Sequence, residues 1–417
     1  MSGRILHSRL LVGLGYYMLR FVTAGESHGQ ALIAWISGLP AGMPVDLEFI
    51  QRELHRRQLG YGRGGRQRIE KDAADILAGV RHGKTIGAPI AVRIENRDWK
   101  NWEKALPVEA AVEDTEGVEG GNDTAGSERP LTAPRPGHAD LAGALKFNFH
   151  DARYVLERAS ARETAARVAA GAFAKLLLRE FGAAVLSHTI AVGHVKMERE
   201  ASWEEITGAC ENLESPLRCV DAKTETRMKA EVDHVLRAGD SVGGIFEVVA
   251  HEIPPGLGSH AQWDEKLDAR IARAVMSIQA VKAVEFGTAI ANAASYGSEV
   301  QDEIRYDDAR KRFARSSNRA GGLEGGITNG SDVVVRGHLK PISTLRRPLL
   351  TADLKTKQAV KAAYERSDVC VVPAGGVAGE AMVAFELAGA FVEKFGGDSM
   401  GEMRRNFEGY AAQLDRF

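Results

Sequence analysis

Arginine and glycine are concentrated in one short segment of the chain, residues 51–68. This segment reads QRELHRRQLGYGRGGRQR and holds one acid. Its arginines are Arg52, Arg56, Arg57, Arg63, Arg66 and Arg68. A guanidinium group donates paired hydrogen bonds to phosphate or carboxylate, and glycine lets the backbone approach a ligand closely. The segment predicts a site for a small anion, with a solvated basic surface or an RNA-binding segment as the alternatives.

A second cationic cluster lies at residues 158–163, where Arg158 and Arg162 flank Ser160. Residues 160–163 read SARE, which fits a capping box at the start of a helix. A helix N-terminus offers free N–H groups and the positive end of a dipole. The pattern favours an anion site and, equally, plain capping beside surface charge.

Two histidines stand apart from the other ten because glycine lies next to or near each of them. His28 lies in GESHG and His138 in RPGHAD. A tight turn at glycine can hold an imidazole towards a cleft, and histidine is the natural proton donor near neutral pH. Both are candidate acids or bases.

Residues 318–330 (NRAGGLEGGITNG) form a glycine-rich loop ahead of a predicted strand. The loop lacks the order of a P-loop or of a dinucleotide-binding turn. Residues 340–344 (KPIST) offer a cation and two hydroxyl groups at the end of that strand. On these residues alone, ordinary turns in a β-rich region are the favoured interpretation.

The elements that position these residues alternate without strict order. We expect strands at 31–36, 86–94, 243–253, 332–338 and 368–372. We expect helices at 46–60, from 160 to about 181, at 263–286 and at 379–395. This mixture predicts the α+β class, with no internal repeat and no interdomain linker.

Composition bounds the function. The 417 residues are 44% hydrophobic and 26% charged with a net charge of −2, so nothing global indicates a nucleic-acid or membrane partner. No run approaches the ~20 apolar residues of a membrane helix. Three cysteines without a CxxC pair disfavour a disulfide framework and a metal site, and they fit a reducing cytosol.

Two segments lie outside this pattern. Residues 1–17 are predicted to be a dispensable extension ahead of Met18, the natural start of a single domain covering residues 18–417. The stretch at about 107–129 is acidic and glycine-rich and carries no Lys or Arg up to residue 128. We expect it to be a solvated, flexible surface excursion.

Several ordered motifs together resemble the chorismate synthase family. The three longest are GESHGQALIAWISGLPAG (25–42), ERASARETAARVAAGAF (157–173) and RSDVCVVPAGGVAGEAM (366–382). LGYGRGGR (59–66), RPGHAD (135–140), SIQAVKAVEFG (277–287), the loop at 318–330 and KPIST also fit. The resemblance extends from Met18 almost to the end, and residues 1–17 have no counterpart.

The resemblance implies a β-α-β sandwich, with a helical layer between two antiparallel sheets, and a cytoplasmic homotetramer. It implies that 5-enolpyruvylshikimate 3-phosphate loses phosphate and a ring proton by anti-1,4-elimination to give chorismate, the last step of the shikimate pathway. Reduced FMN is implied although no net redox change occurs. Its reductant is either NADPH or an external donor, on which bacterial-type members usually rely.

The resemblance also assigns roles to residues of this chain. His28 is expected to protonate the leaving phosphate, His138 to protonate reduced FMN, and Asp368 to lie near flavin N5 and help accept the ring proton. The substrate-binding arginines are Arg57, Arg63, Arg66, Arg135, Arg162 and Arg366. The FMN-binding residues are Arg158, Ala159, Ser160, Gln279, Ala280, Gly325, Lys340, Pro341, Ile342, Ser343, Thr344 and Arg366. Arg57 and Arg63 also match the family's NADPH contacts.

Two other classes of function compete with this one. An NADPH-dependent flavin reductase would need a dinucleotide site, and no G-x-G-x-x-G turn is evident. An RNA-binding protein would show a basic overall balance or stacking aromatics in its Arg/Gly segment. Tyr61 is the one aromatic residue there.

Overall fold

The computed structural model describes residues 19–65, 69–109, 130–308, 311–364 and 368–417. The predicted extension at residues 1–17 lies outside these ranges, as do Arg66, Arg366 and most of the acidic segment predicted at about 107–129. The described chain combines antiparallel sheets with helices, which confirms the α+β class.

Two main sheets are built from strands that alternate in burial. The first sheet has the order β1-β2-β6-β3 and comprises Arg20–Ala24, Ala31–Ser37, Ile90–Glu95 and Ala74–Ala78. The second has the order β10-β15-β9-β7-β8 and comprises Val281–Phe286, Val333–Leu339, Gly244–His251, Ala184–Val192 and Val195–Lys196. Every paired strand in both sheets is antiparallel.

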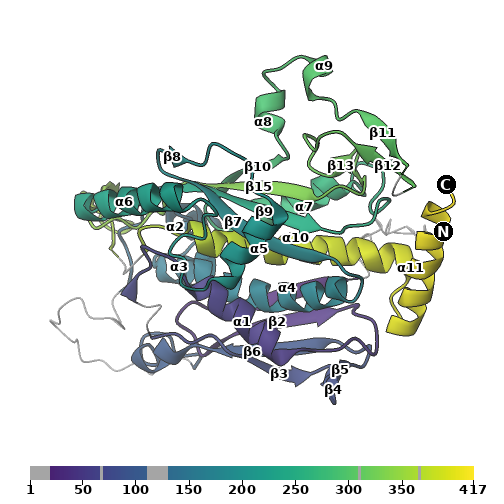
Figure 1. Cartoon of the computed structure of the whole chain (residues 1–417). Helices are drawn as coiled ribbons and strands as arrows, with labels where there is room; N and C mark the ends of the chain where they lie inside the picture. The colour runs from purple at the N-terminus through teal and green to yellow at the C-terminus, as the bar shows by residue number, and fades with distance from the viewer. Residues whose placement is uncertain (1–18, 66–68, 110–129, 309–310, 365–367) are drawn as a thin grey trace, which may run out of the picture.

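Helices lie between the two sheets (Figure 1). They are α1 (Leu47–Gln58), α4 (Thr164–Arg179), α7 (Leu267–Met276) and α10 (Val372–Phe395). Helix α10 packs on β7 and β9 on one side and on α4 on the other, while α4 packs on β2 and β6. Small residues allow this close approach: a Cβ at Gly171 of α4 would lie 2.3 Å from Cβ of Ala381 in α10.

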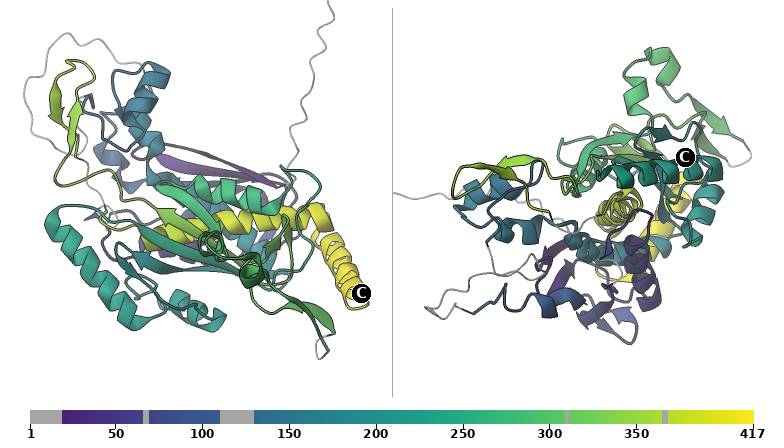
Figure 2. Two further views of the ribbon diagram at one scale, coloured as in Figure 1. Left: turned by 90° about the horizontal axis from the view of Figure 1, so that it is seen from above. Right: turned by 90° about the vertical axis from the view of Figure 1, so that its left-hand side faces the viewer.

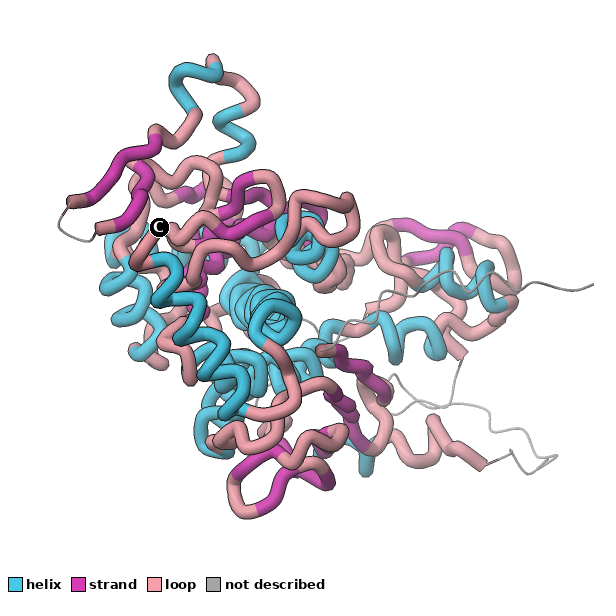
Figure 3. The backbone as a smooth tube through the Cα atoms, turned by 90° about the vertical axis from the view of Figure 1, so that its right-hand side faces the viewer, coloured by secondary structure: helices cyan, strands magenta, loops and turns pink. Residues whose placement is uncertain are grey.

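Helix α10 is the centre of the core, and Figure 3 shows it end-on among the other elements. Among the described residues it is the one helix long and apolar enough to span a membrane by length and composition. However, 94% of its most apolar window is buried inside the protein, the pattern of a core helix.

Smaller elements surround these layers. The additional helices are η2 (Arg97–Asn101), α2 (Asp140–Phe147), α3 (Arg153–Ala159), η3 (Ala161–Glu163), α5 (Trp203–Glu211), α6 (Ala222–Ala238), α8 (Ala289–Asn292), α9 (Gly297–Val300) and α11 (Met400–Leu414). The additional strands are β4 (Val80–Arg81), β5 (Lys84–Thr85), β11 (Ile304–Asp307), β12 (Arg312–Arg315), β13 (Leu323–Glu324), β14 (Ile327–Thr328), β16 (Leu350–Ala352) and β17 (Ala359–Lys361).

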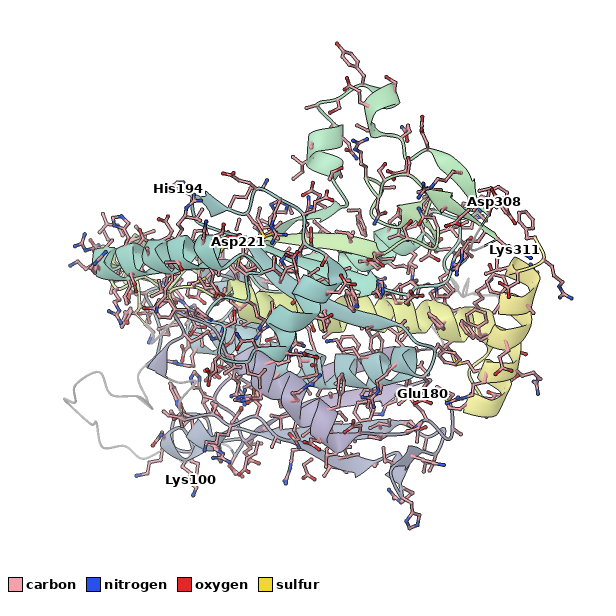
Figure 4. The ribbon with its side chains drawn as sticks, viewed as in Figure 1. Lys100, Glu180, His194, Asp221, Asp308 and Lys311 are labelled. Atoms are coloured by element: carbon pink, nitrogen blue, oxygen red, sulfur yellow. The ribbon has the colours of Figure 1, made fainter. Side chains whose placement is uncertain are left out.

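Two contacts show how these elements attach. Glu180, at the end of α4, lies beside α11 (Figure 4), where Arg404 forms an ion pair with it. The β16-β17 hairpin stands beside α2 and α3 at the other end of the molecule (Figure 2). Backbone hydrogen bonds connect the hairpin region to the segment that precedes α2, from Leu354 N to Thr132 O (2.8 Å) and from Ala363 N to Ala133 O (3.1 Å).

Most predicted elements are confirmed, with shifted ends. Helix α1 begins after Asp46, whose side chain caps it, and β2, β9 and β15 match their predicted strands. The strand predicted at 86–94 occupies Ile90–Glu95 instead. The strand predicted at 368–372 is wrong, because Cys370 makes only an isolated bridge and α10 begins at Val372.

The helix predicted over 263–286 is wrong in its second half. Helix α7 ends at Met276, and Val281–Phe286 forms β10. Ala280 lies between them with φ of +69°, a left-handed conformation that interrupts the helix. The following residues then pair with β15, and the tertiary pairing outweighs the helical periodicity.

Candidate active site

A cavity of about 1130 Å³ lies at the end of the helical layer where α10 begins. Its walls come from the first turns of α10, the segment between α7 and β10, the end of β15, η2 and η3. Most of the predicted site residues line it: His28, Arg57, Arg63, Arg135, His138, Ser160, Arg162, Gln279, Ala280, Lys340, Ile342, Ser343, Thr344 and Asp368.

Four predicted site residues in the described part of the chain do not line the cavity: Arg158, Ala159, Gly325 and Pro341. The guanidinium of Arg158 donates instead to Thr23 O at 3.0 Å and to Gly25 O at 3.4 Å. Arg66 and Arg366 belong to the residues that the structure does not describe.

Gly325 lies far from the cavity because of its place relative to α7. It occupies the turn of the β13-β14 hairpin, and its neighbour Gly326 accepts a hydrogen bond from Leu267 N at the start of α7. Gln279 and Ala280 follow the other end of that helix. A ten-residue helix is about 15 Å long, which separates the hairpin from the cavity within one chain.

Arg57 and Arg162 share one buried carboxylate, that of Asp72. Nη2 of Arg57 lies 2.6 Å from Asp72 Oδ2, and Nη1 of Arg162 lies 2.5 Å from Asp72 Oδ1. Burial opposes the charge on Asp72, but the two guanidinium groups outweigh it and lower its pKa. The pairing holds both arginines in place, while buried Nε of Arg57 and Nη2 of Arg162 have no hydrogen-bond partner.

Asp368 is anchored to the Arg/Gly segment across about 300 residues of sequence. Its Oδ2 lies 3.1 Å from Nη1 of Arg63, and its Oδ1 accepts a 2.5 Å hydrogen bond from Gly64 N. Nε of Arg63 is buried without a partner. The structure therefore brings the carboxylate and one of the predicted anion-binding arginines together at the cavity wall.

His28 follows a tight turn that only glycine tolerates. Gly25 has φ of +100°, and a Cβ there would lie 2.2 Å from Ala31 O. The ring of His28 stacks on Trp102 with centroids 4.0 Å apart, and its Nδ1 lies 2.8 Å from Oε1 of Glu157. An ionised carboxylate can only accept, so Nδ1 carries the hydrogen of this bond.

His138 is held in a similar way. Gly137 before it has φ of +75°, and Nδ1 of His138 lies 2.5 Å from Oδ1 of Asp140. Arg135 forms two hydrogen bonds to the same carboxylate, of 2.8 and 3.0 Å. Burial opposes the charge on Asp140, but the hydrogen bonds from His138 and Arg135 hold its pKa well below its usual range.

The predicted FMN residues form a third wall. Lys340 N donates to Ala280 O at 2.9 Å, while the side chains of Lys340 and Ser343 both donate to Gly137 O. Oε1 of Gln279 is buried without a partner. The left-handed conformation of Ala280 is uncommon for a residue with a side chain, and such backbone strain clusters at functional sites.

The capping box predicted at Ser160 and Glu163 is not formed. Ser160 accepts from Arg162 N at 3.2 Å and starts the short helix η3, and α4 begins only at Thr164. The carboxylate of Glu163 is turned to Thr23 and Arg167 instead, at 2.7 and 2.8 Å. Ser160 faces the cavity beside Ser27, whose hydroxyl lies 3.1 Å from its own.

The sequence analysis did not identify the residues that hold the predicted site residues in place. Glu157 and Asp140 lie within quoted motifs, next to arginine or near histidine, and that proximity could have indicated pairing. Asp72 and Trp102 had no such signal, because each reaches the site only through the folding of the first sheet and η2.

Five arginines and one lysine line the cavity in the described chain, against three acids. With two histidines held by carboxylates, this site has the features of an enzyme active site that takes a small molecule. Among the described residues, no group of three or more His, Cys, Asp or Glu side chains could hold a metal ion.

Comparison with known proteins places the chain. The family model for chorismate synthase matches residues 19–392. Chorismate synthases of Solibacter usitatus and Koribacter versatilis are 61% and 60% identical, each over 96% of this chain and 100% of the relative. A crystal structure of chorismate synthase superposes with a TM-score of 0.74 at 40% identity, covering 96% of this chain and 99% of its own. The chain belongs to the chorismate synthase family and is a lyase.

Proposed function

We propose that the cavity converts 5-enolpyruvylshikimate 3-phosphate into chorismate and phosphate, with reduced FMN bound beside the substrate. The observation that carries this proposal is the meeting, in one cavity, of the cationic and histidine motifs that are far apart in sequence. We also infer that the layering of the two sheets around α4 and α10 is the β-α-β sandwich of the family.

The arginines fit a substrate that carries two carboxylates and a phosphate. Arg57, Arg63 and Arg162 line the cavity, and one nitrogen of each is buried without a hydrogen bond, although that of Arg162 lies 3.7 Å from Oε2 of Glu70. A buried donor without a partner costs about 1–3 kcal/mol, and an anionic ligand would remove that cost. Arg135 would contribute from its place beside His138 and Thr344. We extend the proposal to Arg66 and Arg366, which lie outside the described residues.

The cavity also fits a flavin. At about 1130 Å³ it exceeds the ~300–1,000 Å³ typical of a pocket for one small molecule, which supports two ligands side by side. Reduced FMN would supply transient electron donation that weakens the C–O bond to phosphate. The residues that would hold it from this chain are Ser160, Gln279, Ala280, Lys340, Ile342, Ser343 and Thr344.

The two histidines and the aspartate are proposed to move different protons. His28 would give a proton to the leaving phosphate, which is a costly dianion when unprotonated. His138, on the wall with Lys340 and Ser343, would hold a proton towards the cofactor. Asp368 would help to accept the ring proton, because its carboxylate is fixed by Gly64 and faces the cavity.

Further properties are inferred from family membership. We infer a cytoplasmic homotetramer. Gly325 and Arg158 do not line this chain's cavity, so they would contact FMN only from a second copy of the chain. An external donor would reduce the flavin, with NADPH at Arg57 and Arg63 as the alternative.

We infer one domain over residues 18–417, and a chain that starts at Met18 should keep full activity. Loss of folding on deletion of residues 1–17 would contradict this.

The RNA-binding alternative loses its support in the structure. Arg56 and Arg57 of the Arg/Gly segment are 1% and 3% exposed, so they do not form a solvated basic surface.

The flavin reductase alternative differs from the elimination in the amount of reductant consumed per product. We expect many turnovers per reduced FMN under anaerobic conditions, without loss of NADPH. Consumption of one equivalent of reductant per chorismate would overturn the elimination.

Substitution of each histidine tests the division of roles in the same assay. His28→Ala should slow turnover by about 10²–10⁴-fold, the usual contribution of a general acid, while FMN still binds. His138→Ala should shift the spectrum of bound reduced FMN from the neutral towards the anionic form. Equal spectral changes in both variants would contradict the assigned roles.

A further inference from the structure

The side chain of Glu157 contacts His28 twice, once at the ring and once at the backbone. Its Oε1 lies 2.8 Å from the ring nitrogen Nδ1, and its Oε2 accepts a 2.7 Å hydrogen bond from the backbone N–H of the same residue. Glu157 is 3% exposed and His28 is 8% exposed. With Trp102 stacked on the ring face, both side-chain torsions of His28 are constrained.

We propose that Glu157 is a positioning residue for the reaction, an inference that rests on the proposed role of His28. Its carboxylate keeps the hydrogen on Nδ1 of His28, so Nε2 is the nitrogen that exchanges a proton with a ligand in the cavity. The hydrogen bond made by one ring nitrogen sets the protonation of the other.

The contacts argue against a purely structural role. The loop that carries His28 is tied to α3 through the backbone as well, by a 2.9 Å hydrogen bond from Ser27 N to Glu157 O. Asn96 holds the loop separately through Gly29 O at 2.7 Å. These bonds do not need the carboxylate of Glu157, which leaves the orientation and protonation of the ring as its distinct contribution.

The same device recurs at the second histidine. Asp140 lies 2.5 Å from Nδ1 of His138, but its charge is shared with the bidentate Arg135. Both histidines of the cavity therefore have Nδ1 occupied by a buried carboxylate from the same chain. Asp332 also lies 2.8 Å from Nδ1 of His251 outside the cavity lining, so the role proposed for Glu157 rests on the position of His28 in the cavity wall.

Glu157→Gln in the full chain tests the proposal. The amide can accept one of the two hydrogen bonds but must donate at its other atom, so it disturbs the ring hydrogen while keeping the shape. We expect kcat to fall about 10²-fold, within the contribution of a general acid, with KM and FMN affinity unchanged. The ¹⁵N NMR spectrum should show the hydrogen of neutral His28 moving from Nδ1 towards Nε2.

A matched control is available in the same fold. His188 and Glu247 form another buried pair at 2.9 Å, on neighbouring strands and outside the cavity lining, so Glu247→Gln should leave kcat unchanged. The double variant His28→Ala with Glu157→Gln should be no slower than His28→Ala alone, because the carboxylate acts through the ring.

The possible outcomes distinguish the positioning role of Glu157 from the proposed role of His28. If Glu157→Gln keeps the wild-type kcat and the Nδ1 hydrogen while His28→Ala is slow, the positioning role is overturned and the proposed function stands. A raised KM with weakened FMN binding and unchanged ¹⁵N shifts would also overturn it, in favour of a structural role. If His28→Ala is fully active, the proposed role of His28 fails instead.

Discussion

Arg56 and Arg57 are consecutive residues of α1, yet they belong to two networks of opposite character. Successive helical residues point about 100° apart, so one side chain enters the core and the other reaches the cavity. Both are nearly fully buried. The comparison shows how neighbouring residues of one type can serve stability and binding separately.

The core network is closed. Arg56 makes two 2.8 Å hydrogen bonds to Glu380 and a further 2.8 Å bond to Glu53, and Lys175 pairs with both acids. Ser187 donates to Glu380 at 2.6 Å. Two cations thus face two carboxylates, which joins α1, α4, α10 and β7.

The cavity network is open. Arg57, Arg162 and Arg63 line the cavity. They face the carboxylates of Asp72, Asp368 and, 3.7 Å from Arg162, Glu70. An incoming anion would therefore meet this network directly. The core network pairs its cations with carboxylates outside the cavity lining, although Nε of Arg56 is also buried without a hydrogen bond.

The pKa values of the two arginines move in opposite directions. Burial opposes the charge on Arg56, but Glu380 and Glu53 outweigh it and raise its pKa well above the ordinary value. Burial also opposes the charge on Arg57, and there Arg162 and Arg63 add to burial, so its pKa is lowered despite Asp72. The fold therefore favours the positive charge on Arg56 and disfavours the positive charge on Arg57.

The largest expected effect is on the core side. Arg56→Met leaves Lys175 as the cation in direct contact with Glu380 and Glu53 among the described residues. Breaking a buried ion pair typically costs about 3–5 kcal/mol. We expect the free energy of unfolding in urea to fall by that amount. As a control, Arg404→Ala removes a partly exposed pair with Glu180 and should cost at most about 1 kcal/mol. Equal losses in both variants would contradict the distinction.

A smaller effect, on binding, is expected on the cavity side. Arg57→Ala and Arg63→Ala should each weaken substrate binding by about 1.5–3 kcal/mol, the range for hydrogen bonds to charged groups. Arg57→Lys should recover little, since lysine cannot form the paired bonds of guanidinium. Titration calorimetry measures the affinity. Urea unfolding should show a smaller loss for Arg57→Ala than for Arg56→Met, because the fold lowers the pKa of Arg57 and Asp72 keeps Arg162. A large loss of stability with unchanged affinity would make Arg57 a core residue.

The sequence separated these two networks only in part. The Arg/Gly segment indicated anion binding for both Arg56 and Arg57 alike, and nothing local distinguishes them. Their difference depends on Glu380 and Asp72, which are 324 and 15 residues away and reach α1 only in the folded chain. Motifs therefore predict which segments contribute to a site, but tertiary packing decides which side chains face it.

The elements show the same limit. Helix α1 was predictable because its cap and apolar spacing are local. The early start of α10 was not predictable, because glycine is a poor helix former. The glycines in its first turns are tolerated because they leave room for the ring of Phe246. A Cβ at Gly379 would lie 2.5 Å from Cε2 of that ring. Close packing of this kind has no signature in a single sequence.

The smallest expected effect near neutral pH is on the pH dependence of stability, which should change only in the acid range. Burial opposes the charge on Glu380, but Arg56 and Lys175 outweigh it and lower its pKa from 4.5 to about 2. A group whose pKa is lowered by folding contributes stability above its unfolded pKa, and that stability is lost as the pH falls towards the folded value. We expect the urea midpoint to be flat with respect to Glu380 from pH 7 to about 5 and to fall below pH 4.5. Arg56→Met should fall less steeply there, because one cation that lowers the pKa is gone. Parallel slopes in the two proteins would show that the closed network does not govern acid stability.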